Sequence, residues 1–450
     1  MILFFSFFFL MILIGYLKWG KNWPLMCFAF FFPILPDYFA LPLRGISLTG
    51  NRFLILVLFV YFLLHKRKIN RLICLFRNSF FKISILFYSS IIFVNLFHLK
   101  ENSDSWNMIV QIIIEQMLVV ILLTMLINSK EKIIDVFDVL SKASFIVSLF
   151  AIFETLFSFN LFYLLKTVES GALQTSYERA GFLRAEVGFG HPVYFGFYSL
   201  VLFIISLFLY RYTKKSFYKV ISIFNVLSIF LSGTRGSIIC LALVVFFILI
   251  FAPTWLIDYY KLIPIFVLAI IYILLFNSNV TSYFLDLIKS IFNFFGANYT
   301  ISNFGTNSSG GESRLAQLSL FEYLRNTDSL IFGLGAKAQV REIIYYRYNG
   351  LWQQSNTYDI GYLAYLGDYG IIGFTSYILY IFLWHLEAFK LYLKSNQSSL
   401  KVITLFFVLF ILAYAINLFN SVGINSIFWI VTALFISFSS LEELKLIGKQ

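Results

Sequence analysis

Long apolar runs separated by short polar segments recur from one end of this 450-residue chain to the other. A helix needs roughly 20 apolar residues to cross a bilayer, and by this measure the sequence predicts about 13 spans. Because backbone polar groups cannot be left unpaired in lipid, each run is interpreted as a helix. We therefore predict an all-α, polytopic integral membrane protein with about 12–13 transmembrane helices. They centre near Phe9, Phe30, Leu58, Ile91, Leu118, Ser148, Phe203, Ser228, Val245, Ile270, Ile378, Val408 and Ile430.

One long polar interval, residues 277–359, interrupts the apolar pattern. Basic residues gather in short loops and in the C-terminal tail, at residues 65–82, 211–219, 390–401 and 444–450. If successive spans cross the membrane in opposite directions, these four segments all lie on one side of it. An excess of Lys and Arg in short loops marks the cytoplasmic side. The C-terminus is therefore predicted to be cytoplasmic, and residues 277–359 are predicted to form a large extracytoplasmic loop with short surface helices. Without an internal repeat, residues 1–450 are expected to form a single membrane-embedded domain.

The composition of the chain indicates which kinds of molecule it binds. Hydrophobic residues make up 60% of the chain, charged residues 12%, and the net charge is +12. In a membrane protein this charge reflects topology and attraction to anionic headgroups, so we expect membrane lipid as a partner and no nucleic acid. The three cysteines lie in or beside apolar segments, where they behave as small hydrophobic residues. Without Cys-rich, Walker or DxD-type patterns, no metal and no cofactor is expected.

A first group of ionisable residues precedes the span near Phe203, in the segment SYERAGFLRAEVGFGHPVYFG. Arg184, Glu186 and His191 crowd together there, and Gly188 and Gly190 favour a tight backbone. These residue types suit a site that binds an anion and transfers a proton. An interfacial loop with solvated charges, in which His191 beside Pro192 only closes a turn, explains the same pattern.

A second candidate is Arg235, in LSGTRGSIICL between two apolar runs. An arginine at this depth is costly and is usually retained because it faces a cavity, a carboxylate or an anionic ligand. Small neighbours such as Gly233 and Gly236 allow a phosphate to approach the backbone, and the following helix adds a favourable N-terminal dipole. Snorkelling of the side chain at a helix end is the alternative.

The polar interval supplies the third group. Arg314 begins an amphipathic run, RLAQLSLFEYLRN, that is typical of a helix on the membrane surface. A cation at a helix start is unfavourable unless an anion or a carboxylate compensates it. Downstream lies a candidate glycan site that combines arginines with aromatic rings. Arginine binds pyrophosphate, and aromatic rings stack on sugars. An aromatic belt at the membrane interface is the alternative. The residues of this candidate site are Arg341, Arg347, Trp352 and Tyr358.

The order of HPVYFG, GTRGS, SRLAQ, IFGLGAK and DIGYLAYLGDYGIIG resembles the O-antigen ligase and polymerase superfamily of bacterial envelope proteins, over about residues 175–440. The resemblance implies a glycosyltransferase C-like fold and a metal-independent reaction of undecaprenyl-diphosphate-linked oligosaccharides. It also implies the bacterial cytoplasmic (inner) membrane as location, and a flippase and a chain-length regulator as partners. In the ligase branch a His-Asn pair usually begins the last motif, whereas Asp359 and Ile360 stand there in this chain, which favours the polymerase branch.

That reaction needs groups that hold the diphosphate and a base that orients the acceptor hydroxyl. We assign the diphosphate to Arg235 and Arg314, followed by Arg184, because arginine keeps its charge and offers paired donors. Asp359 is the first candidate base, followed by Glu186 and His191. Transfer of the glycan to a lipid or protein acceptor, as in a ligase, remains an alternative.

A lipid-linked glycan transporter or flippase is the alternative from another class. Glu115 and Glu154 support it, because both lie inside predicted spans, where ionisable groups are functional candidates. Transporters usually show paired repeats and broken helices at the membrane midplane. Neither is evident in this sequence, so we favour the transferase.

Overall fold

The computed structural model describes residues 2–20, 22–42, 47–64, 75–100, 102–168, 178–179, 182–259, 285–286, 289, 299, 310–348, 350–356, 358–395, 398–419 and 426–447. The predicted span near Ile270, most of the predicted interval at 277–309, and Cys74 lie outside these residues. Cys27 and Cys240 are buried, free thiols, as expected for small core residues.

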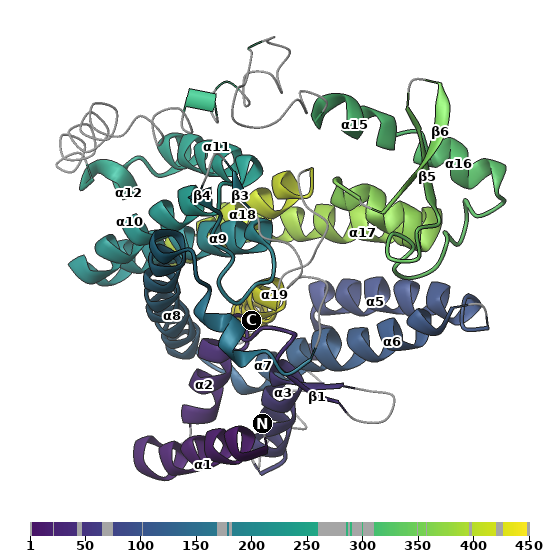
Figure 1. Cartoon of the computed structure of the whole chain (residues 1–450). Helices are drawn as coiled ribbons and strands as arrows, with labels where there is room; N and C mark the ends of the chain where they lie inside the picture. The colour runs from purple at the N-terminus through teal and green to yellow at the C-terminus, as the bar shows by residue number, and fades with distance from the viewer. Residues whose placement is uncertain are drawn as a thin grey trace.

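The described chain is helical, with six helices that are long and apolar enough to cross a membrane and five shorter apolar ones. This confirms the predicted all-α, polytopic membrane protein (Figure 1). The long helices are α5 (Ser79–Phe97), α6 (Ser103–Gln111) continued through the π-helix Ile112–Leu118 into α7 (Val119–Leu126), α8 (Lys130–Phe157), α9 (Pro192–Thr213), α17 (Gly361–Lys394) and α18 (Ser398–Asn417). The shorter ones lie within α1 (Ile2–Trp19), α3 (Gly50–Leu64), α10 (Ser216–Leu231), α11 (Arg235–Phe251) and α19 (Ser426–Ile447).

The remaining elements are short and connect or cover these helices. They are α2 (Trp23–Phe31), the 3-10 helix Leu161–Leu165, α12 (Thr254–Ile257), α15 (Gly310–Gln317) and α16 (Leu320–Asn326). The strands form three antiparallel hairpins, β1 (Ala40–Pro42) with β2 (Ser47–Thr49), β3 (Glu178–Arg179) with β4 (Phe182–Leu183), and β5 (Ile344–Tyr348) with β6 (Leu351–Ser355).

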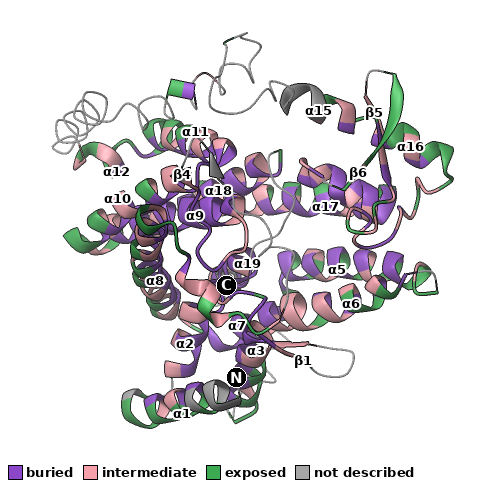
Figure 2. Cartoon of the chain, in the orientation of Figure 1, coloured by how far each residue is buried: buried purple, intermediate pink, exposed green. Residues whose placement is uncertain are grey.

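Helix α9 is the centre of the molecule, because 83% of its apolar window is buried, the largest share among the six long helices. It packs against α8, α10, α11 and α18. Buried residues concentrate on α9, α18 and α19, whereas α1 and α8 keep exposed faces (Figure 2). Exposed apolar faces on the peripheral helices are suited to contact with lipid chains.

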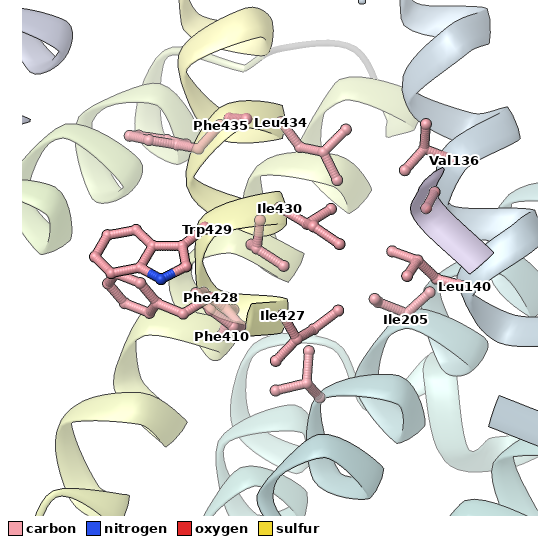
Figure 3. Packing of buried hydrophobic residues seen from close by; sticks show 14 of the residues in the cluster. Val136, Leu140, Ile205, Phe410, Ile427, Phe428, Trp429, Ile430, Leu434 and Phe435 are labelled. Atoms are coloured by element: carbon pink, nitrogen blue, oxygen red, sulfur yellow. The ribbon is translucent and has the colours of Figure 1, made fainter. Parts of the chain in front are cut away.

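A second part of the core surrounds α19. Phe428 and Phe435 of α19 pack against aromatic rings of neighbouring helices, with 6.1 Å between the centroids of Phe428 and Phe410. Val136, Leu140 and Ile205 cover the other side of the same helix (Figure 3). Side chains of this size interlock at interior packing density and hold the helices in one arrangement.

Polar side chains also join the helices inside the apolar core. The hydroxyls of Ser141 on α8 and Ser206 on α9 lie 2.9 Å apart, and Asn225 on α10 donates to the Ser144 hydroxyl at 3.1 Å. Such interhelical hydrogen bonds satisfy polar groups that would otherwise face hydrocarbon. They fix the rotation of α8, α9 and α10 relative to one another.

Helix α17 bends at Gly370, whose φ of 63° is outside the helical region. The loop 330–338 lies against this bend, with the Ile371 N–H donating to the Leu330 carbonyl at 2.9 Å. A Cβ at Gly370 would overlap the Ile331 carbonyl oxygen, and one at Gly333 would lie 2.5 Å from the Gly370 nitrogen. The motifs IFGLGAK and DYGIIG therefore meet backbone to backbone, which only glycine permits at these positions.

The surface part of the long loop differs from the prediction. The amphipathic run that begins at Arg314 is not one helix, because α15 ends at Gln317 and α16 begins at Leu320. The Ser319 hydroxyl lies at the break, where it donates to the Ala316 carbonyl and accepts the N–H of Arg347 from β5. The tyrosine-rich run thus forms a hairpin that packs beside α15 and α16 (Figure 1).

The connections between helices gather at two ends of the molecule. At one end, His98 contacts the Phe332 carbonyl and Arg184 donates to the Ser232 carbonyl, so segments predicted to be extracytoplasmic lie together. At the other end, Lys130 pairs with Glu442 and Arg211 with Asp258. The topology predicted from the basic loops, including the side of the membrane assigned to each end, stays a prediction.

Candidate functional site

The first two sequence groups meet at the N-terminal ends of α9 and α11. Arg184 is buried, and its Nε donates to the Ser232 carbonyl at 2.9 Å while its Nη2 donates to the Thr234 hydroxyl at 3.1 Å. Thr234 in turn donates to the Pro192 carbonyl at 3.2 Å. The guanidinium of Arg184 therefore holds the GTRGS turn in place.

Arg235, by contrast, is the first residue of α11 and is only half-buried. Its neighbours Gly236 and Ser237 are buried. A Cβ at Gly196 of α9 would lie 2.7 Å from the Ser232 and Ser237 hydroxyl oxygens, so this glycine lets α9 approach the turn closely. The arginine and the N-terminal end of α11 together give a positive region, as the sequence predicts for an anion site.

Glu186 and Glu154 lie together behind this turn. The buried carboxylate of Glu154 accepts the N–H groups of Glu186 and Val187 at 3.3 and 2.9 Å. Glu186 is 2% exposed and accepts a hydrogen bond from the Tyr163 hydroxyl. Burial raises the pKa of Glu186, whereas the bond from Tyr163 opposes the shift. A carboxylate in this environment has the raised proton affinity that suits a general base.

His191 is the N-cap of α9, and its Nδ1 accepts the N–H of Val193 at 3.1 Å. Pro192 follows at the first helical position, as is common for helix starts. His191 thus closes the turn into α9, and its role as a base stays a prediction. Nδ1 is used by the helix start, so this nitrogen would not act as a base in a reaction.

Arg314 and Asp359 come together where α15 meets the start of α17. Gln317 donates to the Asp359 carboxylate at 3.0 Å and accepts the Asp359 N–H at 3.0 Å, so α15 is fastened to the start of α17. Loss of hydration lowers the pKa of Arg314, and the nearby Asp359 carboxylate raises it. The structure thus brings a candidate diphosphate ligand and the first candidate base into one cluster.

Neither residue lies at or caps the start of a helix, whereas the sequence predicts such a position for Arg314. Arg314 lies in the last turn of α15, not at a helix start, because the helix begins earlier, at Gly310. A cation is favourable at that end of a helix. Asp359 does not cap α17 either: the N-cap is Ile360, with no side-chain cap bond. The carboxylate of Asp359 is held by Gln317 instead.

The candidate glycan residues divide into two kinds. Arg341 donates to the Leu334 and Gly335 carbonyls, and the buried Tyr358 donates to Asp368 at 3.2 Å, so both support the loop from inside. Arg347 and Trp352 form an exposed cross-strand pair on β5 and β6. Arg347 contacts Glu322 at 3.4 Å in an exposed ion pair, and such pairs are weak. The hairpin pair is therefore the part that a glycan can reach.

Sequence reasoning missed Asp368, which organises the loop before α17. Its carboxylate accepts the N–H groups of Lys337 and Ala338, each at 3.1 Å, as well as the Tyr358 hydroxyl. The signal was an acidic residue inside an apolar span, the same signal that singled out Glu115 and Glu154. Gln317 was also missed, because a glutamine on an amphipathic helix is normally solvated.

The acids that supported a transporter have partners within the chain. Glu115 pairs with Arg52 at 2.6 Å, and Glu154 binds backbone N–H groups. Their burial is therefore explained without a transported ion. Among the described residues, no group of three or more His, Cys, Asp or Glu could hold a metal ion.

Helix α18 lies between the two clusters, since it packs against α9, α11 and α17. Near its end, the Leu418 carbonyl accepts the N–H of Gly361 at 2.7 Å. The two clusters thus belong to one membrane-embedded frame of apolar helices with reactive residues at the helix ends. This arrangement defines a multi-pass membrane protein with a site at one end of its bundle.

Residues 217–378, a little over a third of the chain, match the family model described as O-antigen ligase. This segment includes Arg235, Arg314 and Asp359, and it supports the O-antigen polymerase and ligase superfamily. The match supports a function of the ligase or polymerase type in polysaccharide assembly. A comparison with curated proteins gives no match.

Proposed function

We propose that the protein polymerises undecaprenyl-diphosphate-linked oligosaccharide repeat units into a surface polysaccharide, such as O-antigen, capsule or exopolysaccharide, on the outer face of the bacterial cytoplasmic membrane. The observation that carries the proposal is the nearness of Arg314 to the carboxylate of Asp359, at the point where Gln317 fastens α15 to the start of α17. A cation for the leaving diphosphate and a carboxylate for the attacking hydroxyl are the two groups that this reaction needs.

In the proposed reaction, a hydroxyl of one repeat unit attacks the anomeric carbon of the other. A new glycosidic bond forms, the bond from the anomeric carbon to the diphosphate breaks, and undecaprenyl diphosphate leaves with the bonding electrons. Asp359 takes the hydroxyl proton. Arg314 and Arg235 stabilise the charge that develops on the diphosphate, and the exposed Arg347–Trp352 pair contacts the glycan.

Gel analysis of surface polysaccharide from a deletion strain tests the reaction type. We expect the ladder of chain lengths to disappear while a single repeat unit persists. Loss of all glycan transfer to the lipid core would identify a ligase instead. An unchanged amount of lipid-linked repeat unit on the outer face would argue against a flippase.

Asp359→Asn tests the role of the base in a purified assay with lipid-linked repeat units. Asparagine keeps the hydrogen bond with Gln317 possible but cannot take up a proton. We expect turnover to fall by about 100-fold or more, as for loss of a general base, while the protein remains folded. Asp328→Asn is the matched control, because Asp328 is an exposed acid of the same loop. Equal turnover in the two variants would exclude Asp359 as the base.

A further inference from the structure

Two buried polar atoms near the first cluster have no hydrogen-bond partner among the residues that the structure describes. They are the Tyr38 hydroxyl and Oε2 of Glu186. Tyr38 is 3% exposed and Glu186 is 2% exposed. An unsatisfied buried polar atom costs about 1–3 kcal/mol, so native proteins normally supply a partner, a water molecule or a ligand.

The side chains that carry the two atoms lie close together. The Tyr38 ring packs edge-on against Tyr163 at a centroid distance of 6.2 Å, and the Tyr163 hydroxyl binds Oε1 of Glu186. Burial raises the pKa of Tyr38, and the carboxylates of Glu186 and Glu154 raise it further. The phenol of Tyr38 is therefore close to a carboxylate whose second oxygen is unused.

The backbone around Tyr38 is held firmly. The Thr167 hydroxyl accepts the N–H of Ala40 at 2.8 Å, and the Thr167 N–H donates to the Tyr38 carbonyl at 3.2 Å. Asn160 donates to the Val187 carbonyl at 2.8 Å, which fixes the loop that contains Glu186. The segments before β1 and after β4 are thus joined, and the positions of both unsatisfied atoms are set before any ligand arrives.

The charge around Tyr38 and Glu186 does not suit the diphosphate end of the substrate. Glu154 and Glu186 lie together, and Asp37 lies near the Arg52–Glu115 pair. These four carboxylates outnumber the two arginines close to them, Arg52 and Arg184, so the local charge is negative, which repels an anion. A neutral polyhydroxylated ligand fits better, because each sugar hydroxyl can donate to a carboxylate oxygen and accept from a phenol.

We propose that Tyr38 and Glu186 form the subsite for the acceptor sugar, the repeat unit whose hydroxyl attacks. This inference rests on the proposed function and extends it to residues before the matched family segment. Tyr38 donates to one sugar hydroxyl, and Oε2 of Glu186 accepts from another. The acceptor is thereby held by groups separate from the arginines that hold the donor diphosphate.

Binding of the lipid-free repeat-unit oligosaccharide, released from the cell's own polysaccharide, tests the subsite by calorimetry in nanodiscs. We expect Tyr38→Phe to weaken binding about 10-fold, as for loss of one hydrogen bond. Glu186→Gln is the second variant, with a similar expected loss. Tyr88→Phe is the matched control, because Tyr88 also has a buried hydroxyl without a partner among the described residues but lies on α5. Its binding should equal that of the wild type.

The outcomes separate this inference from the proposed function. Arg314→Ala should leave binding of the lipid-free oligosaccharide unchanged, since this probe has no diphosphate. If Tyr38→Phe melts like the wild type and binds the oligosaccharide equally well, a water molecule satisfies the two atoms and the subsite is wrong. Absence of binding by the wild type would also overturn it. If binding depends on Tyr38 but purified protein makes no polymer, the subsite stands and the proposed reaction fails.

Discussion

The arginines of this protein have the same charge but different surroundings, and these decide their roles. Arg184 uses its donors on the Ser232 carbonyl and the Thr234 hydroxyl, so it supports the turn that precedes α11. Arg235 begins that helix and is half-buried at its positive end. The residue types were visible in the sequence, but which arginine supports the fold depends on contacts between segments about 50 residues apart.

Arg314 is the arginine whose substitution should affect polymerisation most directly. We expect Arg314→Ala to lower turnover by about 100-fold, and Arg314→Lys to lower it about 10-fold, because lysine keeps the charge but loses the paired donors. Turnover is measured with purified lipid-linked repeat units. Arg325→Ala is the control, since Arg325 also lies in the last turn of a short helix in the same loop but is exposed. A normal rate for Arg314→Ala would remove the diphosphate role from this residue.

We expect Asp37 to make the stability of the protein depend on pH. Its side chain is reached by solvent but is closely surrounded by protein; the loss of hydration and the Glu115 carboxylate raise its pKa from 3.8 to about 6, against the opposing effect of Arg52. The folded state therefore binds the proton more tightly than the unfolded state does. The stabilisation from this proton is present below about pH 4 and is lost as the pH rises through about 6.

Asp37→Asn removes this dependence. We expect the variant to melt at a higher temperature than the wild type at pH 7.5, and the difference to shrink as the pH falls from about 6 towards 4. Thermal unfolding in detergent at several pH values measures it. Asp104→Asn is the control, because Asp104 pairs with Lys337 instead of facing a like charge. A difference that stays constant with pH would show that Asp37 does not titrate in this range.

Among the elements, most spans were predictable, but not the one near Phe30, where α2 has only nine residues, and not the long loop. Apolar runs specify helices through the cost of unpaired backbone groups in lipid, so the pattern alone is sufficient. The loop between them folds through single contacts, such as the Ser319 hydroxyl that joins α16 to β5. Such contacts leave no periodic signal. This is why one amphipathic helix was predicted where the chain forms α15, α16 and a hairpin.

We expect the bend of α17 at Gly370 to tolerate substitution poorly, because the loop 330–338 packs against it. In Gly370→Ala, the new methyl group would overlap the Ile331 carbonyl, in addition to the strain of a left-handed φ. We expect a large fall in melting temperature and loss of polymer, since the bend positions the loop that ends at Asp359.

Gly350→Ala separates the effect of steric overlap from the effect of backbone strain. Gly350 has a φ of +82°, but a Cβ added there would meet nothing within 4 Å, so its substitution adds only backbone strain, about 1–2 kcal/mol. A modest loss of stability here beside a severe loss in Gly370→Ala would confirm close packing of the two motifs. Equal losses of stability in the two variants would show that backbone strain alone explains both.

For the whole molecule, alternation of the spans was predictable because each crossing reverses the direction of the chain. The helices that follow one another in sequence, α8 to α11, also pack together. The position of α18 between α9, α11 and α17 was not predictable, because helix packing in a membrane depends on small residues and polar contacts more than on hydropathy. That packing decides how far the Arg235 cluster lies from the Arg314 cluster.

The orientation of the bundle in the membrane is the last prediction, and every site proposed above depends on it. Lys214 and Lys215 are exposed in the short loop between α9 and α10, and such residues remain on the cytoplasmic side. A reporter fused after Ser216 should therefore show a cytoplasmic signal. A reporter inserted at Gly350, in the exposed turn between β5 and β6, should show an extracytoplasmic one. An inverted result for both reporters would place Arg314 and Asp359 on the cytoplasmic side, where a repeat unit already moved across the membrane would not reach them.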